Sequence, residues 1–349
     1  MQAHDKYMHR CIELARLGLG SVSPNPLVGS VIVCDGMIIG EGYHQRYGEA
    51  HAEVNAVKDV LRQHPDAREL LKRSTMYVSL EPCVHFGKTP PCADLIIRQE
   101  IPHVVVGCRD PFAQVNGKGI EKLREAGIRV TTGILEQECL AVNRRFFTRV
   151  QKQRPYIILK WAQTSDHYFA PAAGQRWITS DPARKLVHKW RSEEDAVLVG
   201  KNTVLTDNPR LNVRDWQGRN PVRIVIDRNL ELPHDLNVFD HSQPTIVFNA
   251  LKTAMDGNIK FLELEDFDHY LPQLIAYQLY IMDVQSIIVE GGAQTLGLFI
   301  RAGLWDEARV FTGPVSWGEG IPAPALGIMP EKTISVADDR LEIYYNTHQ

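Results

Sequence analysis

The sequence predicts a two-domain α/β protein, with an α/β/α layered domain in its first half and a second α/β domain after it. The chain has 349 residues, and domains of ~150 residues are common, so the length suggests about two domains. Apolar, β-prone runs alternate with amphipathic stretches, which is typical of helices packed on a sheet. The composition agrees, because 44% of the residues are hydrophobic and 23% are charged, as in ordinary globular proteins.

The first half alternates helix and strand, with Asp35-Gly36 as a hairpin signal between two apolar runs. The expected helices cover residues 5–19, a run that starts at His51, 83–100 and 119–126. The expected strands cover residues 29–34, 37–44, 76–80, 103–108 and 129–131. Together these elements predict helices layered on a single sheet.

The pattern breaks around residues 141–154, where basic and polar residues prevail. We therefore expect a boundary near residue 150, between a first domain at 1–148 and a second at 149–349. The expected strands of the second half cover residues 156–162, 196–200, 222–227, 245–248 and 287–290. Its expected helices cover residues 181–190 and 293–302. This mixture predicts a second α/β domain with a site of its own.

The clearest chemical signal is a set of motifs in the first half. His51 and Glu53 belong to His-Ala-Glu, Cys83 to Glu-Pro-Cys and Cys92 to Pro-Pro-Cys. One imidazole and two thiolates can hold a zinc ion and leave its fourth position to water. Glu53 can then move protons without binding the metal, as in zinc-dependent deaminases of amino-pyrimidines or amino-purines. Three unrelated residues are the alternative, and the joint occurrence of the motifs in one order argues against it.

The spacing of the two thiols is unusual, because this deaminase signature normally ends in P-C-x-x-C. Here the loop between them contains Gly87 and two prolines, which can reverse the chain and bring Cys92 back to Cys83. We expect Cys83 to open a helix, so that both ligand groups lie near helix N-termini, where partial positive charge favours thiolate. His85 is a possible competing ligand, but we expect it to face solvent or substrate.

Charge and composition exclude several classes of function. A net charge of −3 gives no basic footprint for nucleic acid. No apolar stretch approaches the ~20 residues of a membrane helix, and the N-terminus lacks the apolar core of a signal peptide. We therefore expect a cytoplasmic protein that binds neither nucleic acid nor membrane. All six cysteines lie at or before Cys139, and in a reducing compartment no disulfides are expected.

Two loops of the second half could bind an anion. Gly291-Gly292 joins an expected strand to an expected helix, and the N–H groups of such a turn can approach a phosphate. A plain turn is the alternative, since the G-x-G-x-x-G pattern is missing. Residues 200–214 combine hydroxyl, carboxylate and guanidinium groups, which suits a phosphorylated sugar or nucleotide, although a solvated loop explains them equally well.

Further motifs accompany these signals in both halves. The first half adds Pro24-Asn25-Pro26 and Gly42-Tyr43-His44. The second half adds residues 159–160, 177–180, 195–200, 203–205, 207–214 and 289–292. With these motifs the whole chain resembles the bifunctional riboflavin-biosynthesis family of bacteria, the RibD/RibG type, which shares the long loop between the two cysteines.

The resemblance implies a cytidine-deaminase-like first domain with zinc and a dihydrofolate-reductase-like second domain with NADPH. The implied substrate is 2,5-diamino-6-ribosylamino-4(3H)-pyrimidinone 5′-phosphate. The first domain would remove the 2-amino group, and the second would reduce the ribosyl chain to ribityl. The product would be 5-amino-6-ribitylamino-uracil 5′-phosphate. The resemblance also implies a homo-oligomer, either a dimer or a tetramer.

The resemblance assigns roles to individual residues. The zinc ligands would be His51, Cys83 and Cys92, with Glu53 as proton shuttle. The deaminase pocket would include Asn25, His44, Lys88 and Thr89, the last two near the substrate phosphate. NADPH would contact Ala162, Trp177, Thr203, Asp207, Arg228, Gly292, Ala293, Gln294, Thr295, Leu296, Gly297 and Leu298. The reductase substrate would contact Gln175, Arg191, Leu211, Arg214 and Glu290, the two arginines being natural phosphate partners. Lys160 and Asp166 would polarise or protonate the sugar.

One departure from the family pattern leaves alternatives open. The family has Asp-Gly after the first reductase strand, whereas this chain has Asp166-His167. Glycine often marks a positive φ or a close approach to a ligand, so the reductase half could be degenerate or serve only as an assembly module. The remaining rival is a nucleoside or tRNA-base deaminase with an unrelated partner domain, which the acidic balance and the motifs of the second half oppose.

Overall fold

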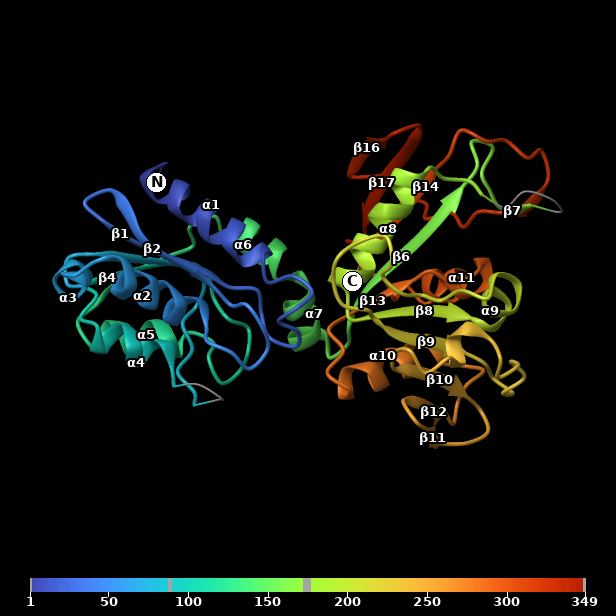
Figure 1. Cartoon of the computed structure of the whole chain (residues 1–349), viewed down its shortest axis with the longest axis horizontal. Helices are drawn as coiled ribbons and strands as arrows, with labels where there is room; N and C mark the ends of the chain where they lie inside the picture. The colour runs from blue at the N-terminus through green and yellow to red at the C-terminus, as the bar shows by residue number, and fades with distance from the viewer. Residues whose placement is uncertain (1, 87–89, 172–176, 348–349) are drawn as a thin grey trace. The chain divides into compact units, whose positions relative to one another are not determined.

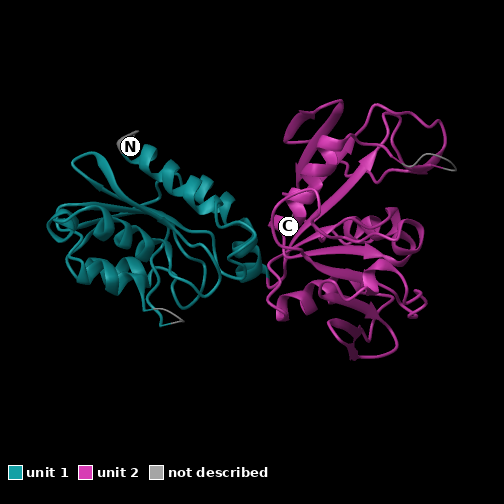
Figure 2. Cartoon of the chain, in the orientation of Figure 1, with its two compact units in different colours: residues 1–152 teal, residues 153–349 magenta. Residues whose placement is uncertain are grey.

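The computed structural model describes residues 2–86, 90–171 and 177–347. It divides into two compact units, Met1–Lys152 and Gln153–Gln349 (Figure 2). The expected break at 148/149 falls inside a helix, α7 (Arg144–Lys152), whose end coincides with the boundary between the units. The basic composition that indicated a break therefore belongs to an amphipathic helix, which buries Phe146 and Thr148.

Unit 1 is built on a five-stranded sheet. Its strands are β1 (Gly29–Cys34), β2 (Met37–Tyr43), β3 (Thr75–Leu80), β4 (His103–Cys108) and β5 (Arg129–Thr132). Their order is β2-β1-β3-β4-β5. Strand β1 is antiparallel to both neighbours, whereas β3, β4 and β5 are parallel. Strands β1 and β4 are buried along their whole length, which explains their nearly continuous apolar sequences.

Helices cover both faces of this sheet, as the layered prediction requires. They are α1 (Gln2–Arg16), α2 (Ala52–Gln63), α3 (Ala67–Leu71), α4 (Cys92–Arg98), α5 (Lys118–Glu125), α6 (Glu136–Val142) and α7. Helices α1 and α6 lie on one face, and α2, α4 and α5 on the other (Figure 1). Helix α2 packs very closely on β2, because a Cβ atom on Gly42 would lie 2.3 Å from the backbone nitrogen of Ala56.

Unit 2 is built on a larger, mainly parallel sheet. Its strands are β6 (Tyr156–Gln163), β7 (Tyr168–Pro171), β8 (Ala196–Gly200), β9 (Val222–Ile226), β10 (Thr245–Asn249), β11 (Ala254–Asp256), β12 (Ile259–Glu263), β13 (Ser286–Val289), β14 (Glu307–Thr312), β15 (Gly320–Pro322), β16 (Lys332–Val336) and β17 (Asp339–Tyr345). The ten-stranded sheet has the order β11-β12-β10-β9-β8-β13-β6-β14-β17-β16. Antiparallel strands form both edges, and β15 pairs with β7 separately.

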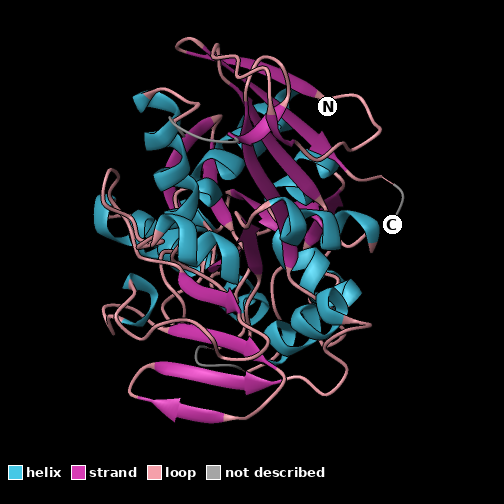
Figure 3. Cartoon of the chain, turned by 90° about the vertical axis from the view of Figure 1, so that its right-hand side faces the viewer, coloured by secondary structure: helices cyan, strands magenta, loops and turns pink. Residues whose placement is uncertain are grey.

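Helices lie on both faces of the large sheet (Figure 3). They are α8 (Asp181–Glu193), α9 (Lys201–Asp207), the 3-10 helix η1 (Asn237–Phe239), α10 (Leu271–Ile281) and α11 (Ala293–Arg301). Successive residues of β6 enter different cores. Ile157 and Leu159 pack in the core of α10 and α11, whereas Ile158 packs in the core of α8. This alternation assigns the side chain of Lys160 to the α8 face.

The expected helix over residues 83–100 is wrong in its first half. Helix α4 begins at Cys92, with Pro91 as its N-cap, and Cys83 lies in irregular backbone after β3. The physical reason is the pair Pro90-Pro91, which has no backbone N–H to donate and is tolerated only where a helix begins. The Cys83 carbonyl instead accepts the N–H of Ala93 (3.2 Å), which ties the loop back onto the helix.

Candidate active sites

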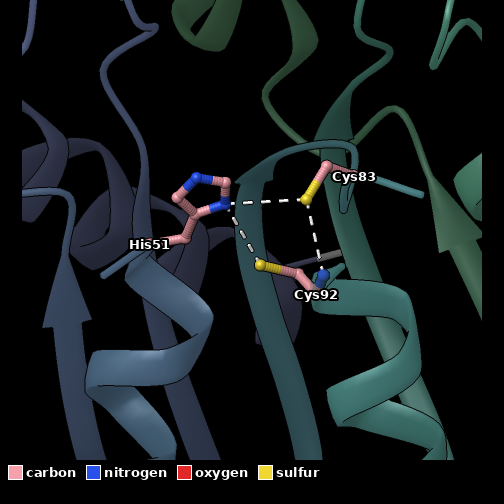
Figure 4. Close-up of side chains that lie close together, drawn as sticks. All are labelled: His51, Cys83 and Cys92. Atoms are coloured by element: carbon pink, nitrogen blue, oxygen red, sulfur yellow. Dashed lines mark hydrogen bonds between the residues drawn. The ribbon is translucent and has the colours of Figure 1, made fainter. Parts of the chain in front are cut away.

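The three proposed zinc ligands meet near the carboxyl end of β3. His51 is the N-cap of α2, Cys83 follows β3 and Cys92 is the first residue of α4. His51 Nδ1 lies 3.6 Å from Cys83 Sγ and 3.3 Å from Cys92 Sγ, and the three atoms lie within 4.8 Å of one another (Figure 4). Ligand atoms of one tetrahedral zinc are ~3.5–3.8 Å apart. The cluster therefore fits a single zinc ion.

The electrostatics of Cys83 also suit a metal ligand. The backbone N–H of Cys92 donates to Cys83 Sγ (3.4 Å), so the N-terminal end of α4 faces this sulfur. Hydrogen bonds from the Cys92 thiol and from His51 lower the pKa of the Cys83 thiol well below its usual value. The thiolate is the form that binds metal, and one imidazole with two sulfurs is a donor set that suits zinc.

Glu53 lies in the first turn of α2, beside the cluster, and is 3% exposed. Burial raises its pKa, while the nearby charge of His51 lowers it. A buried carboxyl group whose pKa is raised accepts a proton more readily than an exposed one and can return it. The geometry therefore suits the expected proton shuttle.

The two expected pocket residues, Asn25 and His44, contact each other beside the metal ligands. Asn25 Nδ2 lies 3.0 Å from His44 Nε2, and His44 Nδ1 lies 3.1 Å from the Ala50 carbonyl. Because that carbonyl only accepts, Nδ1 carries the proton and Nε2 accepts from Asn25. The His44 ring centroid lies 5.5 Å from that of His51. The other two expected pocket residues, Lys88 and Thr89, lie outside the described residues.

Glu81 has a role that sequence reasoning missed. Its buried carboxylate accepts the N–H groups of Gly117 (2.9 Å) and Gly119 (2.9 Å), and those of Asp110 and Ile120 at 3.3 Å. It thereby fixes the loop before α5 next to the Cys83 segment. The signal in the sequence was a charged residue directly after a β-prone, largely apolar strand, where a charge needs buried donors.

Three charged residues expected in the reductase site form one cluster in unit 2. Arg191 of α8 and Glu290, after β13, make a bidentate pair, with Nε–Oε1 and Nη2–Oε2 distances of 2.7 Å. Burial raises the pKa of Glu290, but the charge and hydrogen bonding of Arg191, together with the charges of Lys160 and His188, outweigh burial and bring that pKa to about 2. Burial lowers the pKa of Lys160, with Glu290 opposing the shift and Arg191 adding to it.

The loop after α9 contains the other described substrate residues. Leu211 is buried and has φ of 52°, whereas the side chain of Arg214 is 51% exposed. Arg191 Nη1 donates to the Asn212 carbonyl of this loop (3.3 Å). Arg191 thus holds both Glu290 and the loop, since each of its three guanidinium nitrogens donates to a protein acceptor. Gln175 lies outside the described residues.

The Gly291-Gly292 turn packs against the turn between β8 and α9. Gly292 is the N-cap of α11, and its N–H donates to Thr203 Oγ1 (2.8 Å). A Cβ atom on Gly200 would lie 2.4 Å from Thr295 Oγ1, so only glycine permits this approach. Three expected cofactor residues, Thr203, Gly292 and Thr295, therefore lie together, and the start of α11 offers N–H groups to a phosphate.

The remaining cofactor residues are more scattered. Ala162 lies near the end of β6, Trp177 is 63% exposed and Asp207 ends α9. Arg228 forms a surface pair with Asp268, at 2.9 and 2.6 Å. Residues 293–298 form the first turns of α11. No single cluster among the described residues gathers all of them.

Asp166 anchors a loop. Its carboxylate accepts the hydroxyl groups of Thr164 (2.5 Å) and Ser316 (2.7 Å) and the N–H of Gly318 (2.7 Å). These hydrogen bonds, with that of Thr164 the largest influence, lower its pKa. A carboxylate held ionised is a poor proton donor, so this geometry favours loop anchoring over sugar protonation. The next residue, His167, has φ of 64°, which is the conformation that glycine adopts most easily.

Together, fold and sites define a class of protein: a zinc-site deaminase unit followed by a reductase unit. Residues 1–108 match the cytidine and deoxycytidylate deaminase zinc-binding region, and residues 155–333 match the RibD C-terminal domain. The chain is 41% identical to the riboflavin biosynthesis protein RibD of Aquifex aeolicus, over 96% of this chain and 94% of that one. The Escherichia coli protein of the same name is 37% identical, with 88% and 87% covered. The chain belongs to the RibD family.

Solved structures agree with the sequence comparisons. A diaminohydroxyphosphoribosylaminopyrimidine deaminase/5-amino-6-(5-phosphoribosylamino)uracil reductase from Thermotoga maritima has a TM-score of 0.88 and 37% identity, with 98% of each chain covered. The RibD protein of Acinetobacter baumannii has a TM-score of 0.86 and 32% identity, with 99% of each covered. The protein is thus a bifunctional deaminase and reductase of riboflavin biosynthesis that uses zinc and NADPH, with a cytidine-deaminase-like and a dihydrofolate-reductase-like fold. Among the described helices, none is both long and apolar enough to cross a membrane.

Proposed function

We propose that this enzyme deaminates 2,5-diamino-6-ribosylamino-4(3H)-pyrimidinone 5′-phosphate in the region 1–148 and reduces the deaminated product in the region 149–349. The observation that carries the first assignment is the cluster of His51, Cys83 and Cys92, with buried Glu53 beside it. The Thermotoga maritima relative, a diaminohydroxyphosphoribosylaminopyrimidine deaminase and 5-amino-6-(5-phosphoribosylamino)uracil reductase, supports this substrate. The product would be 5-amino-6-ribitylamino-uracil 5′-phosphate.

In the deaminase, His51, Cys83 and Cys92 would hold zinc, whose Lewis acidity activates water near neutral pH. Glu53 takes one proton from the attacking water and delivers it to the ring nitrogen, and then moves the second proton of that water to the departing ammonia. His44, neutral and oriented by Asn25 and the Ala50 carbonyl, lines the pocket. Lys88 and Thr89 are proposed to meet the substrate phosphate.

In the reductase, NADPH supplies the hydride when it is bound. Lys160 is the proposed proton donor, because burial lowers its pKa and Glu290 keeps it oriented by charge. We assign Glu290 and Arg191 to fixing this end of the site, and Arg214, with its half-exposed guanidinium, to the substrate phosphate. Leu211 and Gln175 complete the proposed substrate contacts.

The proposed cofactor contacts form two groups, one supported by contacts in the structure and one by the resemblance alone. Thr203, Gly292 and Thr295 gather at the start of α11, which suits a pyrophosphate. The others remain proposals from the resemblance: Ala162, Trp177, Asp207, Arg228, Ala293, Gln294, Leu296, Gly297 and Leu298. Asp166 is proposed to contribute by anchoring the loop that contains Ser316 and Gly318, rather than by transferring a proton.

We further propose a cytoplasmic homo-oligomer, either a dimer or a tetramer. All six cysteines are free thiols, in line with a reducing compartment. Light scattering during size-exclusion chromatography measures the mass directly, and a monomeric mass of 39.5 kDa would contradict the proposal.

The deaminase assignment is tested by Glu53→Gln and Cys83→Ser, with Cys34→Ser as a thiol control outside the cluster. Glu53→Gln is expected to retain zinc and to lose deamination by ~10²–10⁴-fold, the usual contribution of a proton-transfer group. Cys83→Ser is expected to lose zinc, whereas Cys34→Ser retains it. Zinc is measured by elemental analysis and deamination by ammonia release. Near-normal deamination in Glu53→Gln would contradict the proton-shuttle role.

A further inference from the structure

We propose that His188 and Asp215 are positioning residues that set the guanidinium of Arg214 for the phosphate of the reductase substrate. This inference rests on the proposed function, in which Arg214 contacts that phosphate. Neither His188 nor Asp215 belongs to the motifs that carry chemistry in the sequence. Both are implicated by their contacts with the loop that contains Arg214.

His188 reaches the loop from α8 with both ring nitrogens. It is 3% exposed. Its Nδ1 lies 3.0 Å from the Asn212 carbonyl, and its Nε2 lies 3.2 Å from Asp215 Oδ2. The two acceptors flank Arg214 in the chain, so His188 contacts the backbone before this residue and the side chain after it. A neutral imidazole has one N–H and donates to one of these acceptors, whereas the protonated ring donates to both.

Asp215 contacts both His188 and Arg214. The carboxylate oxygen that faces His188 also lies 3.7 Å from Arg214 Nε. On its other side Arg214 Nη1 lies 3.4 Å from Asn212 Oδ1. The guanidinium is therefore held from two sides, yet its side chain is 51% exposed. A cation that is oriented and still open is suited to bind a phosphate.

The same loop is tied to the reacting end of the site. Arg191, one turn after His188 on α8, donates from Nη1 to the Asn212 carbonyl (3.3 Å) and is fixed by Glu290. Two side chains of α8 therefore converge on one carbonyl oxygen. Hydrogen bonds thus link Arg214 to Asn212 and Asn212 to Arg191, which is itself paired with Glu290.

The test measures NADPH oxidation by the full-length, zinc-loaded protein with two substrates: the deaminated ribosyl phosphate and its 5′-hydroxyl analogue. The variants are His188→Ala, Arg214→Ala and, as a control, His241→Ala, which removes an exposed histidine of a surface His–Asp pair. His188→Ala is expected to raise KM for the phosphorylated substrate about tenfold, with kcat within about twofold, because the phosphate is remote from the reacting carbon. In His188→Ala, KM for the 5′-hydroxyl analogue and the affinity for NADPH should be unchanged. In His241→Ala, KM for the phosphorylated substrate should be unchanged.

Conservative variants separate positioning from simple misfolding. The amide of His188→Asn places a donor near the position of Nδ1, and that of His188→Gln places one nearer to Nε2. Each variant should therefore have a lower KM for the phosphorylated substrate than His188→Ala. If His188→Ala impairs both substrates and NADPH binding equally, its role is merely structural and the inference is wrong. If Arg214→Ala raises KM and His188→Ala does not, the inference alone fails. If Arg214→Ala leaves the preference for phosphate unchanged, the proposed phosphate contact fails and the inference falls with it.

Discussion

His167 shows how one residue can depart from a family pattern without abolishing the local fold. Its φ of 64° costs a non-glycine residue ~1–2 kcal/mol. The turn nevertheless forms, since the N–H of His167 donates to the Thr164 carbonyl (3.0 Å) and the Gln163 amide contacts His167 Nδ1 (3.0 Å). The backbone therefore takes the conformation that glycine would take.

We expect His167→Gly to change the free energy of unfolding by no more than ~1 kcal/mol, because backbone relief and the lost contact with Gln163 offset each other. His167→Ala, which keeps the strained φ and loses the contact, should be less stable than His167→Gly by ~1 kcal/mol. Urea unfolding measures both, and NADPH oxidation should stay within about threefold of wild type. A large gain of reductase activity in His167→Gly would mean that the histidine impairs the site.

His103 predicts a pH dependence of stability in unit 1. Burial, followed by the charge of Arg129, lowers its pKa to about 4, whereas an unfolded histidine has a pKa near ~6.5. Between these values the unfolded chain binds more protons than the folded one, so stability is lost as pH falls from ~6.5 toward ~4. His103→Gln should show a shallower loss in this window. The unfolding midpoint of both zinc-loaded proteins measures the difference, and identical slopes would contradict it.

At the scale of elements, Glu81 joins β3 to the loop before α5. Glu81→Gln replaces one acceptor oxygen by an NH2 group that faces backbone donors, which costs ~1–3 kcal/mol for each buried group left unpaired. We expect the variant to lower the unfolding midpoint of unit 1 and the deamination rate, and to leave NADPH oxidation with supplied intermediate unchanged. Glu121→Gln, an exposed change on α5, is the matched control. An unaltered midpoint for Glu81→Gln would show that these hydrogen bonds do not hold the loop.

Elements with a strong pattern were predictable, and those set by tertiary contacts were not. Strands β1, β4, β8 and β13 are short apolar runs bounded by polar residues, and the structure confirms them. The helix expected over 83–100 failed because Pro90-Pro91 outweighs the apolar periodicity around it. Strands β11, β15 and β16 were missed, since they are largely exposed and lack an alternating pattern.

Some residues of the candidate sites were predictable from the sequence and others were not. His51, Cys83 and Cys92 are recognisable because zinc demands particular ligand types at limited spacing, and the structure brings them together. The roles of Glu81 and His188 were not assigned from the sequence, because their partners are distant in sequence: backbone N–H groups for Glu81, and the Asn212 carbonyl and Asp215 for His188. The pairing of Arg191 with Glu290 also depends on residues 99 positions apart. Such roles follow from packing rather than from motifs.

At the scale of the whole molecule, each unit has its own sheet, core and site. The two reactions should therefore be separable by mutation. Loss of the proton shuttle in unit 1 should stop the deamination step and leave the reduction of supplied intermediate intact. Loss of Lys160 should have the opposite effect, with deaminated product accumulating.

The most direct test of the two-step account is a product analysis by mass spectrometry. The protein is given the diaminopyrimidine ribosyl phosphate with and without NADPH, and Glu53→Gln is given the deaminated intermediate with NADPH. We expect deaminated product alone without NADPH, reduced product only with NADPH, and normal reduction by Glu53→Gln. Deamination without any reduction would show that unit 2 is not an active reductase. Absence of both products from zinc-loaded protein would contradict the proposed substrate.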